Sequence, residues 1–214
     1  MTIFKYAKTL FFVLVAGLLM STLQGFSNLE ATQESEISNR IHSQIFEDFK
    51  DNNPHKRYSI SYFASKPGDG KSDRVFVGQD AGHSYVRLTK FDPATHSQDG
   101  LSFGFYPDFT YWPVFREQGP AVIRSNEFSH WHYKRTYSVN LDQFNDLLDF
   151  ASSKSQNAEY NLQDYNCTDF VIRLSELTSN PIPDSQKKWP FGKGSTPVAL
   201  AENLALLNNG NRFD

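Results

Sequence analysis

The chain lacks several features that mark common protein classes. It has one cysteine in 214 residues, so no internal disulfide can form. Its formal net charge of −3 argues against a general nucleic-acid binder, because such proteins usually carry a basic surplus. The sequence contains no internal repeat, no low-complexity tract and no His-Glu-x-x-His motif. Repeat architectures and that class of zinc hydrolase are therefore not indicated.

The unbroken apolar run over residues 10–20 is short for a membrane-spanning helix, which needs about 20 residues. Lys5 and Lys8 precede this run, and small residues follow it. The pattern predicts an export signal over residues 1–27 and a single mature domain over residues 28–214. An uncleaved N-terminal anchor is the alternative. We therefore expect a secreted or periplasmic protein that contacts a membrane only through an uncleaved N-terminal segment.

Hydrophobic spacing predicts an α+β fold, with an antiparallel sheet packed against helices. Aromatic residues make up 15% of the chain, which supports a well-packed interior rather than disorder. Residues 114–123, 152–161 and 189–197 are expected to be irregular. Strands are predicted over residues 57–64, 75–77, 83–89, 101–106 and 127–139, and helices over residues 37–49, 141–151, 167–174 and 197–207.

The only cysteine, Cys167, lies where a helix is predicted to begin. Asn166 is a good N-cap residue, and Asp169 can complete a capping box. A thiol in the first helical turn lies near converging N–H groups and the positive end of the helix dipole, where a thiolate is favoured. Such cysteines commonly have a lowered pKa and react as nucleophiles.

A structural interpretation of Cys167 competes with the catalytic one. One apolar face of the predicted helix contains Cys167, Phe170, Val171 and Leu174. A free cysteine on such a face also serves as a small core residue.

His83 is the candidate base for a cysteine nucleophile. It follows Gly82 at the mouth of a predicted strand, where backbone crowding is low and a second element can approach. A hydrogen-bonded strand-end histidine without chemistry is the alternative. His42, His55 and His96 are interpreted as surface residues.

Hairpin geometry suggests a third group. If the strand that begins at His83 pairs with the strand over residues 101–106, the residue opposite His83 lies near Tyr106 to Asp108. Asp108 could then accept from the imidazole and orient it, or it could simply cap the turn after a proline. Gln163 could donate to an oxyanion, although it is equally interpretable as a loop residue.

A metal site is a further alternative. His130 and His132 lie two apart on a predicted strand, so their rings would share a face, and such pairs can bind zinc. No third ligand is evident from spacing, so we favour two polar histidines that flank Trp131 on a strand.

Two segments together resemble the circularly permuted papain-like group, which includes permuted NlpC/P60 proteins and lecithin:retinol acyltransferase relatives. They are Gly82-His83-Ser84-Tyr85-Val86-Arg87-Leu88 on a strand and, later, Tyr165-Asn166-Cys167-Thr168-Asp169-Phe170-Val171 at a helix start. The resemblance implies that Cys167 is the nucleophile, His83 the base, and the Cys167 N–H part of an oxyanion hole. It also implies a polar third group on the strand after the histidine strand.

We therefore expect an exported cysteine hydrolase of permuted papain-like fold that acts by acyl transfer, with Cys167, His83 and Asp108 as catalytic residues. The resemblance suggests cell-wall peptide amides as substrate, and it implies neither a cofactor nor a metal. A lipid or ester acyltransferase of the same fold is one alternative. A non-catalytic binding protein that retains the fold is the other.

Overall fold

The structure of the chain is a computed structural model that describes residues 40–207, except residues 72, 76, 78–79, 109–117 and 190–191. The contacts between residues separate the chain into two units, with the boundary after residue 40. The described residues from Ile41 on form one compact unit. The predicted export signal and the start of the predicted helix over residues 37–49 lie outside the described residues.

The unit is built on a six-stranded sheet with the order β5-β1-β2-β3-β4-β6, in which every neighbouring pair is antiparallel. The predicted α+β class is confirmed. The strands are β1 (Arg57–Ser65), β2 (His83–Asp92), β3 (Ser97–Pro107), β4 (Gln118–Ser125), β5 (Tyr133–Val139) and β6 (Glu159–Asn161), and a separate hairpin contains β7 (Gln186–Trp189) and β8 (Gly192–Ser195).

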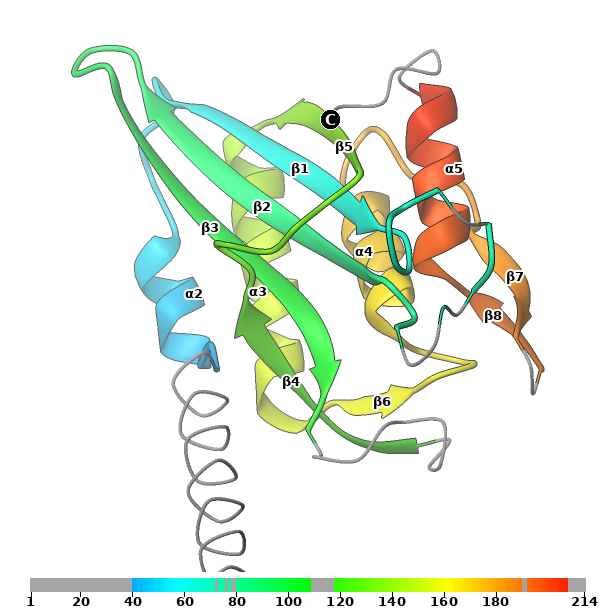
Figure 1. The fold of residues 1–214 in the computed structure, drawn as a ribbon. Coiled ribbons are helices and arrows are strands. Elements are labelled where there is room, and N and C mark those ends of the chain that lie inside the picture. The colour runs from blue at the N-terminus through cyan, green and yellow to red at the C-terminus, as the bar shows by residue number, and fades with distance from the viewer. Residues whose placement is uncertain are drawn as a thin grey trace, which may run out of the picture. The chain divides into compact units, whose positions relative to one another are not determined.

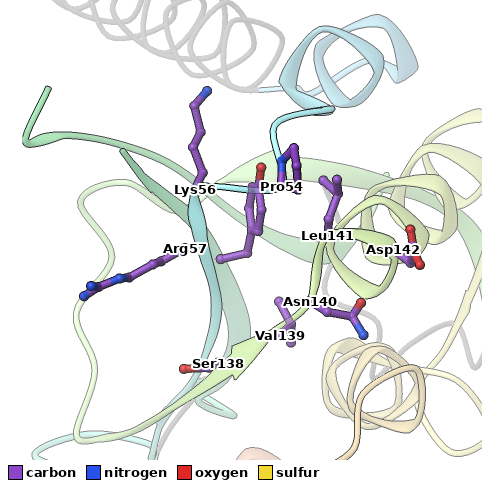
Figure 2. Close-up of a pocket in the computed structure, with 9 residues that line it drawn as sticks. Pro54, Lys56, Arg57, Ser138, Val139, Asn140, Leu141 and Asp142 are labelled. Carbon is purple, nitrogen blue, oxygen red and sulfur yellow. The ribbon is translucent and has the colours of Figure 1, made fainter. Parts of the chain in front are cut away.

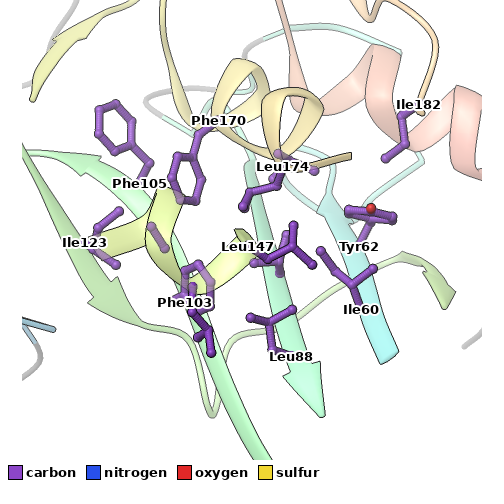
Figure 3. Packing of buried hydrophobic residues seen from close by; sticks show 14 of the residues in the cluster. Ile60, Tyr62, Leu88, Phe103, Phe105, Ile123, Leu147, Phe170, Leu174 and Ile182 are labelled. Carbon is purple, nitrogen blue, oxygen red and sulfur yellow. The ribbon is translucent and has the colours of Figure 1, made fainter. Parts of the chain in front are cut away.

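The helices in the described residues are α2 (Ser43–Phe49), α3 (Leu141–Asn157), α4 (Cys167–Glu176) and α5 (Pro197–Leu207). Figure 1 shows α3 and α4 behind the central strands, while the connection from β4 to β5 crosses the other face of the sheet. The main core lies between the sheet and the helices. Figure 3 shows this layer, in which Phe103 and Phe105 of β3 face Phe170 of α4.

Phe105 and Phe170 stack with ring centroids 5.4 Å apart, and both side chains are fully buried. Each buried aromatic side chain of this size stabilises the fold by about 1.5–3 kcal/mol relative to an exposed one. The apolar face of α4 is thus packed as its helical spacing predicted, and this packing fixes the helix against β2 and β3.

Several predicted elements are wrong in extent. Of the predicted strand over residues 75–77, the described residues Val75 and Val77 belong to no strand, and Val77 makes an isolated bridge with Asp80. The predicted strand over residues 127–139 begins only at Tyr133, after a turn in which the Ser129 N–H donates to the Asn126 carbonyl. Strands β4, β6 and β8 lie largely in segments that were expected to be irregular.

The helix predicted over residues 37–49 begins only at Ser43. Ile41 has the expected apolar spacing and is buried, but its N–H donates to the Ile123 carbonyl of β4. The Ile41 N–H is thus bonded to a strand, whereas a helix that began at residue 37 would have used it for a bond within the helix.

The hairpin between β2 and β3 sets the surroundings of His83. Tyr85 pairs with Gly104, and Asp92 pairs with Ser97, so the connection is far shorter than the polar stretch suggested. Continuing this register by two residues places Tyr106 opposite His83. The two rings stack with centroids 4.2 Å apart, which agrees with the geometry expected for this end of the hairpin.

Candidate functional site

The start of α4 has the predicted capping box. The Asn166 side-chain oxygen accepts from the Thr168 N–H at 2.8 Å, and Asp169 accepts from the Asn166 N–H at 2.9 Å. These bonds satisfy donors that a helix leaves without internal partners. Cys167 is therefore the first residue of α4, as expected.

A second set of bonds holds this helix start in place. The Asn166 amide group donates to the carbonyls of Leu162 and Ser195, at 2.9 and 2.8 Å. The Ser195 hydroxyl donates to Asp169 at 2.6 Å. Because Ser195 belongs to β8, the β7–β8 hairpin is bonded directly to the turn that carries Cys167.

The start of β2 meets the start of α4. The hydroxyls of Ser84 and Thr168 lie 3.0 Å apart, and both residues are fully buried. The backbone N–H of Ser84 also faces the Cys167 thiol as a hydrogen-bond donor. The strand that carries His83 and the helix that carries Cys167 therefore touch at the residues next to the two candidates.

The Cys167 thiol is not activated in this structure. The residue is only 6% exposed, and burial raises the pKa of the thiol. Donors at Ser84, Tyr160 and Thr168 offset part of this effect but do not reverse it. The expectation of a lowered pKa is wrong, because loss of hydration outweighs the favourable position at the helix start.

The His83 ring lies on the sheet face away from α4. Ser84 points toward Thr168, and successive side chains of a strand point to opposite faces. His83 stacks on Tyr85 and Tyr106, with centroids 6.0 and 4.2 Å away. Burial lowers the pKa of His83 to about 3, so the imidazole is neutral at physiological pH.

The structure thus brings the two chain segments together but shows no hydrogen bond between the Cys167 thiol and the His83 ring among the described residues. A protonated thiol and a neutral imidazole are the resting forms. For the pair to react, the proton would have to move at the moment of attack, by general-base catalysis rather than from a preformed ion pair.

A second polar side chain that the sequence did not indicate lies beside His83. A side chain at Gly104 would place its Cβ 2.6 Å from both His83 Nε2 and Asn126 Oδ1. Both atoms are buried and have no hydrogen-bond partner. They therefore lie within about 5 Å of each other, above a glycine whose lack of a Cβ leaves room for both side chains.

Asn126 is held rigidly at this place. Its N–H donates to the Ser102 carbonyl at 3.0 Å, and its side-chain amide donates to Tyr106 at 2.5 Å and to Ser129 at 2.8 Å. Asn126 follows β4 and directly precedes the segment predicted to be strand, so nothing in its spacing pointed to His83. Only the register of β3 with β4 brings it there.

Asp108 and Gln163 have structural contacts. The Asp108 N–H donates to the Pro120 carbonyl at 2.7 Å, and the residue lies two positions beyond Tyr106, which is the residue opposite His83. The Gln163 N–H donates to Asn161 at 2.9 Å, and the Gln163 side chain packs on Gly192 of β8.

The two histidines before β5 contact each other, with their Nε2 atoms 3.3 Å apart. The Lys66 N–H donates to Nδ1 of His132 at 3.1 Å. Neutral His132 therefore carries its proton on Nε2, where it donates to His130 and cannot ligate a metal. Within the described residues no three potential ligands cluster around a metal site.

A cavity of about 580 Å³ lies at the far end of β1 (Figure 2). Arg57 lines this cavity, whereas Ser65, at the other end of the strand, pairs with His83. Eight extended residues span about 27 Å, so this cavity is not part of the Cys167 site. Its lining comprises Pro54, Lys56, Arg57, Tyr58, Ser138, Val139, Asn140, Leu141 and Asp142.

Comparison of the chain with protein-family models, with curated proteins and with solved structures found no match. In the described part of the chain, no helix combines the length and the apolar character needed to cross a bilayer.

Proposed function

We propose that the protein is an exported cysteine hydrolase that acts by acyl transfer, with Cys167 as nucleophile and His83 as base. The observation that carries the proposal is the contact of Ser84 with the first turn of α4, because it brings the backbone next to His83 to the thiol. The His83 ring lies on the other face of the sheet, so the ring would have to turn toward the sulfur for the reaction. The anchored helix start supports it further, since a nucleophile needs a fixed position.

In the proposed reaction, the His83 imidazole takes the thiol proton while Cys167 sulfur bonds to the carbonyl carbon of the substrate. The carbonyl electron pair moves to oxygen, and N–H groups of the first helical turn can stabilise that charge. Collapse of this intermediate breaks the bond to the leaving group, which receives the proton from His83. Water then attacks the thioester, releases the acid and restores the thiol.

The permuted papain-like arrangement is part of this proposal. The order of a histidine strand before a cysteine helix supports it, as does an antiparallel sheet that packs against that helix. Amide bonds, such as those of cell-wall peptides, are the proposed substrate class, and the export signal expected from the sequence supports an extracellular target. Asp108 is the proposed orienting group for the imidazole. The alternative substrate, for the same acyl-transfer chemistry, is a lipid or ester acyl donor.

One observation favours a second candidate function, a non-catalytic binding protein of the same fold. Burial raises the pKa of Cys167, as expected for a packed core thiol. The two functions differ in whether the thiol forms a covalent intermediate.

Incubation with p-nitrophenyl acetate tests the proposal, because this ester acylates a reactive thiol and releases a coloured phenolate. Intact mass should show one acetyl group on the wild type and none on Cys167→Ser at early times. The acetyl group should then be lost to water, with continued phenolate release. An acetylation rate equal in the two proteins would exclude the hydrolase and leave the binding protein.

A further inference from the structure

The β7–β8 hairpin concentrates positive charge in a chain whose formal net charge is −3. Residues 186–195 contain three lysines and no acidic residue. Lys187 is paired, because its ammonium group contacts the Glu202 carboxylate of α5. Lys188 and Lys193 are exposed, and neither has an ion pair or a hydrogen bond with another described residue. The hairpin therefore presents two unpaired cations to solvent.

These two cations lie beside each other. Lys188 and Lys193 are direct partners in the antiparallel register of the hairpin. Directly opposite residues have Cβ atoms about 4.5–5.5 Å apart, and like charges at such positions destabilise a sheet. An acidic residue at either position would replace this repulsion with attraction. An anion held between the two ammonium groups would do the same, so the pair is suited to bind one.

The lysine pair lies on the side of the hairpin that faces the start of α4. Successive side chains of a strand point to opposite sides, so Lys193 and Ser195 of β8 share one side. Lys188 lies on that side as well, because it is directly opposite Lys193. The Ser195 hydroxyl donates to Asp169, in the first turn of α4. The two cations therefore point to the same side as the bond that ties the hairpin to the turn of Cys167.

The separation between this pair and the thiol suits an extended substrate. Lys193 is two residues from Ser195 along β8, which is about 6.8 Å, and Asp169 is two residues from Cys167 in α4. The bond between Ser195 and Asp169 is 2.6 Å long. These steps place the pair on the order of 10–20 Å from the sulfur, which an extended peptide of about three to five residues spans.

We propose that Lys188 and Lys193 form a subsite for a carboxylate in the acyl group of an acidic peptide substrate, about three to five residues from the carbonyl carbon that Cys167 attacks. This inference rests on the proposed function and names the charge of its substrate. Each ammonium group can donate to one carboxylate oxygen, and the carboxylate relieves the repulsion between them. The bonds from the hairpin to Asn166 and Asp169 keep the subsite at a fixed distance from the thiol.

Two p-nitrophenyl esters of the same peptide test the subsite on the full chain. Succinyl-trialanine p-nitrophenyl ester ends in a carboxylate, whereas acetyl-trialanine p-nitrophenyl ester carries no charge. The measured quantity is the ratio of their kcat/KM values for acylation of Cys167 at low salt. The wild type should favour the succinyl ester about threefold to tenfold. At an ionic strength of about 1 M, where charges are screened within about 3 Å, the ratio should fall to about one.

Three variants distinguish the subsite from a general effect of charge. The double variant Lys188→Gln/Lys193→Gln should lower the ratio to about one. Lys193→Glu should also abolish the preference, yet its melting temperature should equal or exceed that of the wild type, because an opposite-charge pair replaces a like-charge pair. Lys187→Gln is the matched control. It removes one positive charge from the other side of the same strand and should keep the wild-type ratio.

Acylation of Cys167 at equal rates by the two esters would overturn this inference alone, as would a preference that survives in the double variant or is lost equally in Lys187→Gln. A lower melting temperature in Lys193→Glu would contradict the like-charge pair on which the inference depends. Equal ester rates together with lysine-dependent cosedimentation with phosphatidylglycerol vesicles would assign the pair to a membrane surface instead. If neither ester acylates Cys167, the proposed function fails and the subsite fails with it.

Discussion

Ser84 and Thr168 share a buried hydrogen bond of 3.0 Å that joins the start of β2 to the first turn of α4. Both hydroxyls are removed from solvent, so the Ser84 hydroxyl depends on Thr168 for its partner. The bond fixes the distance between the strand that carries His83 and the helix that carries Cys167. The geometry of the proposed site therefore depends on it.

Thr168→Val tests this bond, because valine keeps the shape of threonine and removes the hydroxyl. It should lower the free energy of unfolding by about 1–3 kcal/mol, since the Ser84 hydroxyl is left buried without its partner. Urea denaturation of Thr168→Val, Ser84→Ala and the double variant, each compared with the wild type, gives a double-mutant cycle. The double variant should be less destabilised than the two single changes added together, whereas strict additivity would show that the hydroxyls do not interact.

Asn166→Ala should cost more than loss of an ordinary helix cap. An exposed cap residue stabilises a protein by about 1 kcal/mol, but Asn166 is buried and also donates to Leu162 and Ser195. We expect a loss of about 2–4 kcal/mol in the free energy of unfolding.

The matched control is Asn140→Ala, which removes the same capping box from the exposed start of α3. Its loss should stay near about 1 kcal/mol in the same urea experiment. Equal losses for Asn140→Ala and Asn166→Ala would show that the buried bonds to Leu162 and Ser195 contribute nothing.

Gly104→Ala should directly disturb the packing around His83. The new Cβ would lie 2.6 Å from His83 Nε2 and Asn126 Oδ1, which is closer than packed atoms approach, so one side chain must move. Gly100→Ala on the same strand is the control, since its Cβ would meet the end of the half-exposed Arg87 side chain, which can shift. A lower melting temperature and altered His83 NMR signals are expected for Gly104→Ala, and the prediction fails if the two variants behave alike.

Asp51 should make the fold sensitive to acid. Burial alone would raise the pKa of this carboxyl, but the Lys56 ammonium and the N–H groups of Asn53 and Asn52 bond to it and lower the pKa overall. A lowered folded pKa means that the stabilisation is complete above the unfolded value, about 3.9, and is lost as the pH falls through the folded pKa.

Asp51→Asn should therefore reduce the free energy of unfolding at pH 7 by about 1–3 kcal/mol and by much less at pH 3. Urea denaturation at the two pH values measures the difference. A loss that is the same at both would show that the charge of Asp51 is not what stabilises the fold.

The sequence was most informative where one local pattern decides the structure. The apolar face of α4, its capping box and the placement of Cys167 follow from residues within one segment. The β2 and β3 strands were found for the same reason, since their alternation is strong. The pairing of His83 with Tyr106 then followed from hairpin geometry.

The remaining features depend on contacts between distant segments. β4 contains Gly119 and Pro120, which suggested a turn. They lie at the start of β4, where it pairs with β6 alone and its ladder with β3 has not begun. Residues 127–132 alternate like a strand but cross the sheet instead. The position of Asn126 beside His83 results from the register of β3 with β4, so spacing alone could not predict it.

The most direct test of the central claim compares acetylation of Cys167 by p-nitrophenyl acetate in the wild type, in His83→Gln and in His130→Gln as the control histidine. If His83 is the base, its replacement should slow thioester formation by about 10²–10⁴-fold, while His130→Gln reacts like the wild type. Equal rates in all three proteins would contradict the account, because the thiol would then react without help from the histidine strand.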